Sequence, residues 1–400
     1  MTQGDHHSHF DLHTLLHSEF TSFYIFHALR SFVNSMIGLF IPVYLYSLGY
    51  FIWQILLFSI LVSSTVLLCI PLAVWLLKKR GFRLTLVFST FLYFLLILLL
   101  NNCDLGAEYV LASGVVLGAY MGFFWPSYHS ELALRGSDAH RGSQIGMLHI
   151  LTVVFTLFAP LLAGFLLENY DYLILLLLAV SLLVLGLFPL FLSKDILLGH
   201  YSFSYFDYLR LYRSSSFASE KIAFLSQGIE TSSLTLVIWP LILFILLSGN
   251  FLDFGFLLTV VGILNVLFLL YFKSKVDGKS KGALLSLSAK LRSLNWFFRA
   301  FVSFFAVFFL FAFESISRLL QGSLEITFMS IFYNNAHKQG YMDYVLCREL
   351  FIHLAKICFF AVLIPFLIVF GESLVVLSYV VLVGIAAALG LSMLQEKQLS

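Results

Sequence analysis

Apolar segments of about 20 residues, the length that an α-helix needs to cross a bilayer, follow one another along almost the whole chain. Only 11% of the 400 residues are charged, too few to cover the surface of a soluble protein of this size. The pattern therefore predicts an all-α membrane protein with twelve transmembrane helices. We place the spans at residues 22–46, 52–77, 84–101, 108–131, 144–166, 172–193, 222–246, 252–272, 283–302, 306–333, 344–370 and 373–394.

Lysine and arginine orient these spans, because positive charges concentrate in cytoplasmic loops. With both termini in the cytoplasm, sixteen Lys and Arg residues lie in inward-facing segments. The outward turns at 47–51, 102–107, 167–172, 247–253 and 371–373 hold none, and Arg299 near an outer helix end is the single exception. We therefore expect an integral multi-pass protein of the plasma (inner) membrane with both termini cytoplasmic.

The polar stretches divide the chain into five parts. We expect a histidine-rich cytoplasmic tail at 1–21, a six-helix bundle at 22–193, a cytoplasmic linker at 194–221, a second six-helix bundle at 222–394 and a cytoplasmic tail at 395–400. The two halves match at an offset of roughly 200 residues, which predicts an internal duplication. Pro42 corresponds to Pro240 and Pro160 to Pro365, and basic turns follow the second and eighth spans at 78–83 and 273–279.

At these turns the chain resembles the major facilitator superfamily. Residues 78–83 and 275–279 stand where that family keeps its basic, glycine-bearing turns, and 135–142 is similar to the turn after its fourth helix. Residues 159–164 are similar to the fifth-helix motif of family antiporters, with two glycines replaced by alanine. The resemblance implies two pseudo-symmetric six-helix bundles around a central cavity. It also implies cytoplasmic gating turns that contain Lys78, Arg80, Gly81, Arg83, Arg135, Arg141, Asp277, Gly278 and Lys279.

Polar and ionisable side chains within the predicted spans carry the functional prediction, because a charge there costs roughly 2.5–3.5 kcal/mol. Several recur at helical spacing and so share one helix face. The resemblance places most of them around the cavity. The candidates for binding substrate or protons are His27, Arg30, Asn34, Tyr120, Trp125, His149, Glu230, Arg318, Gln321, Glu325, Glu349, His353 and Lys356.

These charges allow two interpretations. In the first, Arg30 or Lys356 attracts an anionic or hydrogen-bonding group, and Glu230 or Glu325 takes up and releases a proton. In the second, internal ion pairs neutralise the charges, Arg318 with Glu314 or Glu325 and Glu349 with Lys356.

Aromatic and histidine side chains have simpler interpretations beside the functional ones. Tyr120 and Trp125 can stack on a substrate or pack against other helices, and His129 is expected to be a hydrated residue at a helix end. The histidines at 6, 9, 13 and 17 have helical spacing but fit a solvated tail better than a metal site. We expect no metal and no cofactor. No phosphate-binding loop or enzyme motif appears, and net charge near +2 does not favour nucleic acid.

The sequence thus predicts a secondary active transporter and no enzyme. It would move a small polar or amphipathic solute by alternating access as a monomer, with membrane lipid, its substrate and protons as partners. The alternative is a transporter-like receptor or partner-binding subunit, or a lipid-handling protein without ion coupling.

Overall fold

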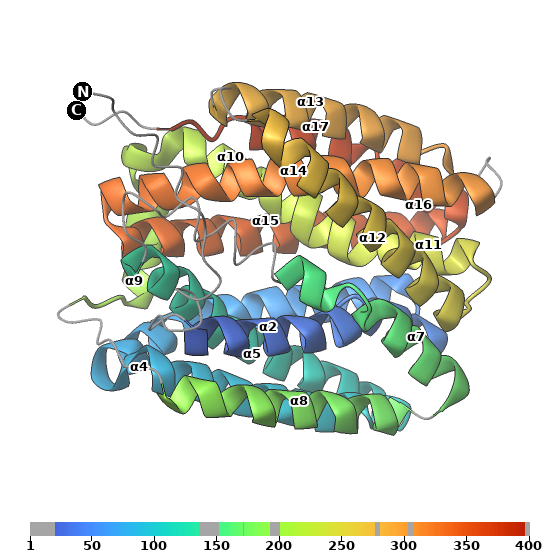
Figure 1. The fold of residues 1–400 in the computed structure, drawn as a ribbon, viewed down its shortest axis with the longest axis horizontal. Helices are drawn as coiled ribbons and strands as arrows, with labels where there is room; N and C mark the ends of the chain where they lie inside the picture. Colours follow the sequence, from blue (N-terminus) through green and yellow to red (C-terminus); the bar gives the residue numbers. More distant parts are fainter. Residues whose placement is uncertain are drawn as a thin grey trace, which may run out of the picture.

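A computed structural model describes residues 21–135, 152–170, 172–192, 201–276, 281–302 and 307–396, and all regular structure within them is helical. Most helices run along one common direction and lie side by side (Figure 1). α2 begins at the same end of the molecule at which the last described residues end (Figure 1). The predicted all-α class is confirmed.

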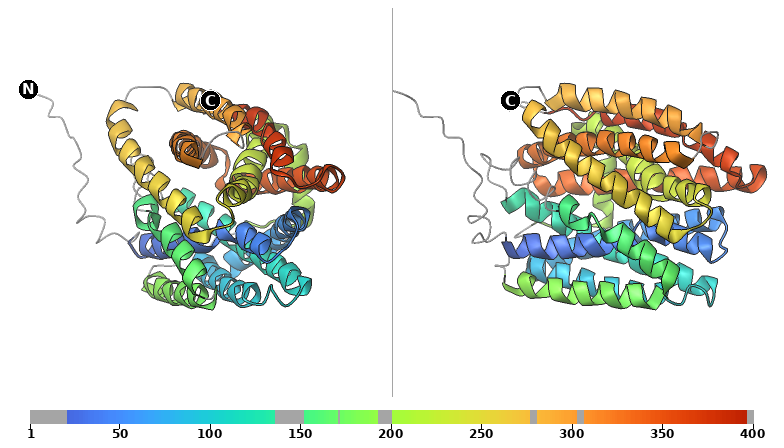
Figure 2. Two further views of the ribbon diagram at one scale, coloured as in Figure 1. Left: turned by 90° about the vertical axis from the view of Figure 1, so that its right-hand side faces the viewer. Right: turned by 45° about the vertical axis from the view of Figure 1, so that its right-hand side comes forward.

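The N-terminal helices occupy one side of the molecule and the C-terminal helices the other, in each of the views (Figure 1, Figure 2). The first group comprises α2 (Thr21–Ile37), α3 (Phe40–Ser47), α4 (Ile52–Leu100), α5 (Ala107–Arg135), α7 (Ala159–Asn169) and α8 (Tyr172–Leu192). The second comprises α10 (Ala218–Ile229), the π-helix η2 (Glu230–Ile238), α11 (Trp239–Leu246), α12 (Phe251–Val276), α13 (Lys281–Arg299), α14 (Val307–Gln339), α15 (Tyr341–Phe370), α16 (Leu374–Val380) and α17 (Val383–Leu391). The short helix α9 (Tyr205–Arg213) lies in the linker between them.

Eight helical stretches in the described part of the chain are long and apolar enough to cross a bilayer, which supports an integral multi-pass membrane protein. One of them, α4, would reach about 73 Å if straight, against a hydrocarbon core of about 30 Å. It is in fact two helices that meet at a kink at Gly81, where φ is 82°. α13 and α14, with 19 and 33 residues, are also long enough to cross a bilayer, and both contain buried charged side chains.

Several helix breaks occur where proline removes a backbone hydrogen bond. Pro42, Pro160 and Pro240 each lie within the first three residues of a helix that follows a break or a change of helix type. η2, the π-helical stretch that begins at Glu230, ends just before α11. Pro365 lies inside the continuous α15, so proline alone does not interrupt every helix. The breaks at α3, α7 and α11 turn side chains of one span toward different neighbours.

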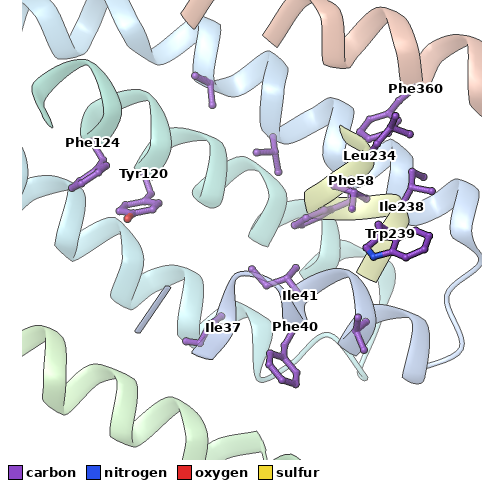
Figure 3. Packing of buried hydrophobic residues seen from close by; sticks show 14 of the residues in the cluster. Ile37, Phe40, Ile41, Phe58, Tyr120, Phe124, Leu234, Ile238, Trp239 and Phe360 are labelled. Atoms are coloured by element: carbon purple, nitrogen blue, oxygen red, sulfur yellow. The ribbon is translucent and has the colours of Figure 1, made fainter. Parts of the chain in front are cut away.

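The core is a continuous apolar cluster that includes both groups of helices. Figure 3 shows Ile41 and Phe58 from the N-terminal group near Leu234, Trp239 and Phe360 from the C-terminal group. All five side chains are buried. Apolar packing therefore closes the middle of the molecule, and polar contacts between the two groups lie toward its ends.

Candidate functional site

His129 and Arg348 join the two groups of helices near the end at which α5 finishes and α15 begins. The Arg348 Nη1 atom donates to His129 Nε2 at 3.0 Å, and His129 Nδ1 lies 2.7 Å from the Tyr333 hydroxyl on α14. Arginine is a donor only, so His129 Nε2 must be the unprotonated acceptor nitrogen. We call His129, Tyr333 and Arg348 the inner clasp. The expectation that His129 is hydrated was wrong, because its side chain is 3% exposed and packed among aromatic rings.

Glu349 extends the inner clasp along α15. Its carboxylate accepts from Arg348 Nη1 at 2.8 Å and lies 3.7 Å from His353 Nε2, while Arg348 Nε donates to the Gln227 side chain at 3.0 Å. The predicted pairing of Glu349 with Lys356 is therefore wrong within the described residues. Lys356 is half-buried, with its ammonium group 6.0 Å from the Phe360 ring.

Glu230 is held by donors from two helices. Its carboxylate accepts from Arg292 Nε at 2.7 Å, Trp296 Nε1 at 2.9 Å and the Thr231 hydroxyl at 2.8 Å. Arg292 also donates to the Ser317 carbonyl oxygen at 2.9 Å. Glu230 lacks a basic partner on its own helix, as the sequence indicates, but α13 supplies one. Both charged side chains are almost fully buried, so this pair is a fixed structural element.

A second buried cluster surrounds Glu314 on α14. The Glu314 carboxylate lies 3.0 Å from Arg318 Nε, pairs with Arg299 and accepts from Trp239 Nε1 at 2.8 Å. The Arg318–Glu314 pair is the one that their four-residue spacing predicts. Arg299, expected near an outer end, is 1% exposed, with its guanidinium 4.0 Å from the Trp239 ring centre. Two arginines thus share one carboxylate, and Arg299 also lies against aromatic faces, which are favourable surfaces for a guanidinium group.

A small cavity lined by both polar and apolar side chains lies between α10, η2, α13, α14 and α17. Its volume is about 20 Å³, room for roughly one water molecule. Its lining comprises Gln227, Glu230, Thr231, Arg292, Gln321, Leu324, Glu325, Phe328 and Leu391. Glu325 is exposed and accepts no hydrogen bond from the described residues. The cavity is therefore lined by one fully paired carboxylate, that of Glu230, and by one exposed carboxylate, that of Glu325.

Arg30 lies in an aromatic environment formed by α5. Its Nη1 atom donates to the Tyr120 hydroxyl, and its guanidinium carbon lies 3.4 Å from the Phe124 ring centre and 5.4 Å from that of Trp125. One turn earlier, His27 stacks on Tyr128 with ring centres 4.6 Å apart. The structure therefore brings His27, Arg30, Tyr120 and Trp125 together, whereas Asn34 is exposed elsewhere on α2.

Two carboxylates join the helix groups at the opposite end of the molecule. Glu372, between α15 and α16, accepts from the backbone N–H groups of Ile52 and Trp53 at 2.8 and 2.7 Å. Glu168 on α7 accepts from the backbone N–H of Phe251 at 3.1 Å. Each carboxylate thus caps the first turn of a helix in the other group, where free N–H groups and the helix dipole favour negative charge. We call Glu168 and Glu372 the outer caps.

Gly164 and Gly255 bring α7 and α12 into backbone contact beside the Glu168 cap. A Cβ atom at Gly255 would collide with the Pro160 carbonyl oxygen, and one at Gly164 would collide with the Phe251 carbonyl oxygen. Only glycine allows this approach. At the outer end, the two groups of helices therefore meet through direct contact between the backbones of α7 and α12 and through the Glu168 cap.

The remaining predicted residues are placed only in part. Lys78 and Arg80 are exposed before the kink at Gly81, and Arg83 Nη1 donates to the Phe191 carbonyl oxygen at 3.1 Å. Arg135 is the last residue of α5. His149, Arg141, Asp277, Gly278, Lys279 and the N-terminal histidines lie outside the described residues. Among the residues that the structure places, no group of three His, Cys, Asp or Glu side chains could hold a metal ion.

Sequence reasoning missed Arg292, Glu168 and Glu372. Arg292 had a usable signal, because it is a charge inside the predicted ninth span. Glu168 and Glu372 had a weaker one, because each is an acidic residue in a turn without Lys or Arg. No family model and no curated protein sequence matches this chain.

Proposed function

We propose that this protein is a secondary active transporter of the major facilitator type, with twelve spans in two six-helix halves that alternate in opening to either side. One observation carries the proposal: polar pairs join the two groups of helices at both ends, and the buried charges lie between these ends. The outer caps hold one end and the inner clasp the other. Such contacts can exchange for water when a face opens, so they suit an interface that must open and close.

Glu325 is the proton-carrying group in this proposal. Glu230 is unsuited to that role, since protonation would leave Arg292 buried without its counter-charge. Glu325 borders the same cavity, has no guanidinium partner among the described residues and is exposed. Its protonation and release therefore disturb no ion pair. The sequence favours Glu230 over Glu325, because Glu230 has no oppositely charged partner on its own helix, whereas the contacts of the two residues favour Glu325.

Reconstitution into liposomes tests this function. An imposed pH gradient, acidic outside, should drive accumulation of a solute from a panel of small polar and amphipathic compounds. Glu325→Gln should abolish accumulation above equilibrium but retain solute exchange at equal concentrations, because exchange requires no net proton movement. The matched control is Glu108→Gln, which removes an exposed carboxylate in the first turn of α5. This variant should behave as wild type. Gradient-driven accumulation by Glu325→Gln would exclude this residue as the proton carrier.

A lateral groove supports lipid handling as a second candidate function. Its volume is about 430 Å³, and it opens between α2, α7 and α12. Only apolar side chains line it, namely Phe32, Phe158, Leu161, Leu162, Phe165 and Leu252. The same liposomes distinguish this candidate if they contain fluorescent phosphatidylcholine. Rapid loss of inner-leaflet label to an external quencher, without gradient-driven solute uptake, would favour lipid handling over transport.

A further inference from the structure

Arg30 differs in its electrostatic partners from the other arginines that are buried or half-buried among the helices. Arg292, Arg299, Arg318 and Arg348 each have a carboxylate within salt-bridge distance. Arg30 is 4% exposed and has no such partner among the described residues, and its Nε has no hydrogen-bond acceptor there. A guanidinium that cannot lose its proton is therefore buried with only a tyrosine hydroxyl and aromatic faces around it. An anion is what this arrangement lacks.

The walls around Arg30 indicate the shape of that anion. Phe124 and Trp125 cover the guanidinium, and Tyr93 packs edge-on against Tyr120 at 4.7 Å. Ligand sites of this kind join a wide apolar surface to a few fixed polar groups. An anion with a carboxylate on a flat apolar body fits both features of this site. The guanidinium forms paired hydrogen bonds with a carboxylate, and the aromatic rings provide the apolar surface for the flat body.

The inner clasp is linked to the covering of Arg30. Trp125 lies over the Arg30 guanidinium and stacks on His129, with ring centres 5.4 Å apart. Because His129 also contacts Arg348 of the other group of helices, the aromatic cover of Arg30 adjoins the contact that must open on the inner side.

Glu325, the proton carrier proposed above, lies on α14, the helix whose Tyr333 contacts His129. Protonation of Glu325 removes one negative charge from the protein, and an anion bound at Arg30 restores it.

We propose that Arg30 anchors the carboxylate of an organic monoanion with an aromatic or similarly flat body, carried together with one proton on Glu325. The proposal rests on the transport function proposed above and names its substrate class. A proton binds Glu325 and the anion binds Arg30 on one side, and both are released on the other. No covalent bond other than the O–H bond of Glu325 forms or breaks, and the cycle moves no net charge.

Binding to the purified full-length protein tests the anchor independently of transport. Thermal unfolding is followed with benzoate, phenylacetate and 3-phenylpropionate, with the neutral benzamide, and in nanodiscs with or without phosphatidylglycerol. At least one carboxylate should raise the melting temperature of the wild type, and benzamide should not. Arg30→Lys should weaken that binding about 10- to 100-fold, and Arg30→Gln should abolish it. Arg213→Gln, an exposed arginine on α9, is the matched control and should bind as wild type.

The outcomes separate the anchor from the transport function. The anchor is overturned if no carboxylate shifts the wild type, if benzamide acts equally, or if the shift persists in Arg30→Gln. A shift from phosphatidylglycerol alone that requires Arg30 also overturns it, because the site would then hold a lipid phosphate. Binding lost in Arg30→Gln without proton-driven uptake by the wild type supports the anchor and refutes the transport function. Electroneutral coupling is refuted if a valinomycin-clamped potential changes the uptake rate of the bound acid.

Discussion

Substitutions in the Glu230–Arg292 pair test whether the Glu230 carboxylate stabilises the fold, in contrast to the Glu325 carboxylate. Glu230→Gln keeps the size and one oxygen of the side chain but removes its charge. Arg292 remains buried, with Nε–H 2.7 Å from a neutral amide in place of a carboxylate. Breaking one partner of a buried ion pair costs about 3–5 kcal/mol, because the other charge is left uncompensated. We expect Glu230→Gln to lower the free energy of unfolding by that amount.

A double-mutant cycle isolates the charge from the shape. Arg292→Met alone should also be costly, since the Glu230 carboxylate would lose its strongest donor. The double variant Glu230→Gln/Arg292→Met buries no charge at this position and should recover most of the loss, to within about 1–2 kcal/mol of the wild type. Glu325→Gln is the matched single-charge control. We expect it to change stability by less than about 0.5 kcal/mol, because this carboxylate is exposed and has no ion-pair partner among the described residues.

Unfolding in mixed micelles, titrated with sodium dodecyl sulfate and followed by circular dichroism, measures all four variants. If Glu230→Gln is as stable as the wild type, or if the double variant is less stable than either single variant, the Glu230–Arg292 pair does not stabilise the fold as a buried ion pair. The same samples in the liposome assay would separate the roles further. Glu230→Gln should lose activity in proportion to its loss of folded protein, whereas Glu325→Gln should lose proton coupling at full stability.

Three further predictions concern the ends of the molecule. Glu372→Ala should remove a cap worth about 0.5–2 kcal/mol and speed hydrogen exchange at the first turn of α4; unchanged exchange there would show that the cap is not needed. Gly255→Ala should lower the melting temperature, because the added methyl group collides with the Pro160 carbonyl oxygen. Gly282→Ala is the control and should leave the melting temperature unchanged, because a methyl group there meets no neighbouring atom. Equal melting temperatures for the two variants would show that α12 can shift at no cost. The pKa of Asp207 lies below its ordinary value of 3.8 because the backbone N–H and hydroxyl of Ser204 donate to it. Its stabilisation of α9 is therefore complete above pH 3.8 and lost as pH falls through the lower folded pKa, and Asp207→Asn should flatten that pH dependence in hydrogen exchange of residues 205–213.

The sequence alone determined the class of this protein and the position of most of its helices. Apolar length and scarce charge predict membrane helices, because a bilayer permits few other backbone arrangements. α13 ends at Arg299 and α14 begins at Val307, close to the predicted division between the ninth and tenth spans. Periodicity also predicted the Arg318–Glu314 pair, since partners four residues apart on one helix must lie on one face.

Only the tertiary structure decided which charges are paired. Glu230 meets Arg292, and His129 meets Arg348, across 62 and 219 residues of sequence. Spacing along one helix contains no information about which face of another helix lies opposite. The same limit applies to the outer caps, where Glu372 meets helix α4 from 319 and 320 residues away. The sequence could therefore identify the charges within the membrane, but helix packing determined that Glu230 is held by a cation, whereas Arg30 meets no carboxylate in the part of the chain that the structure describes.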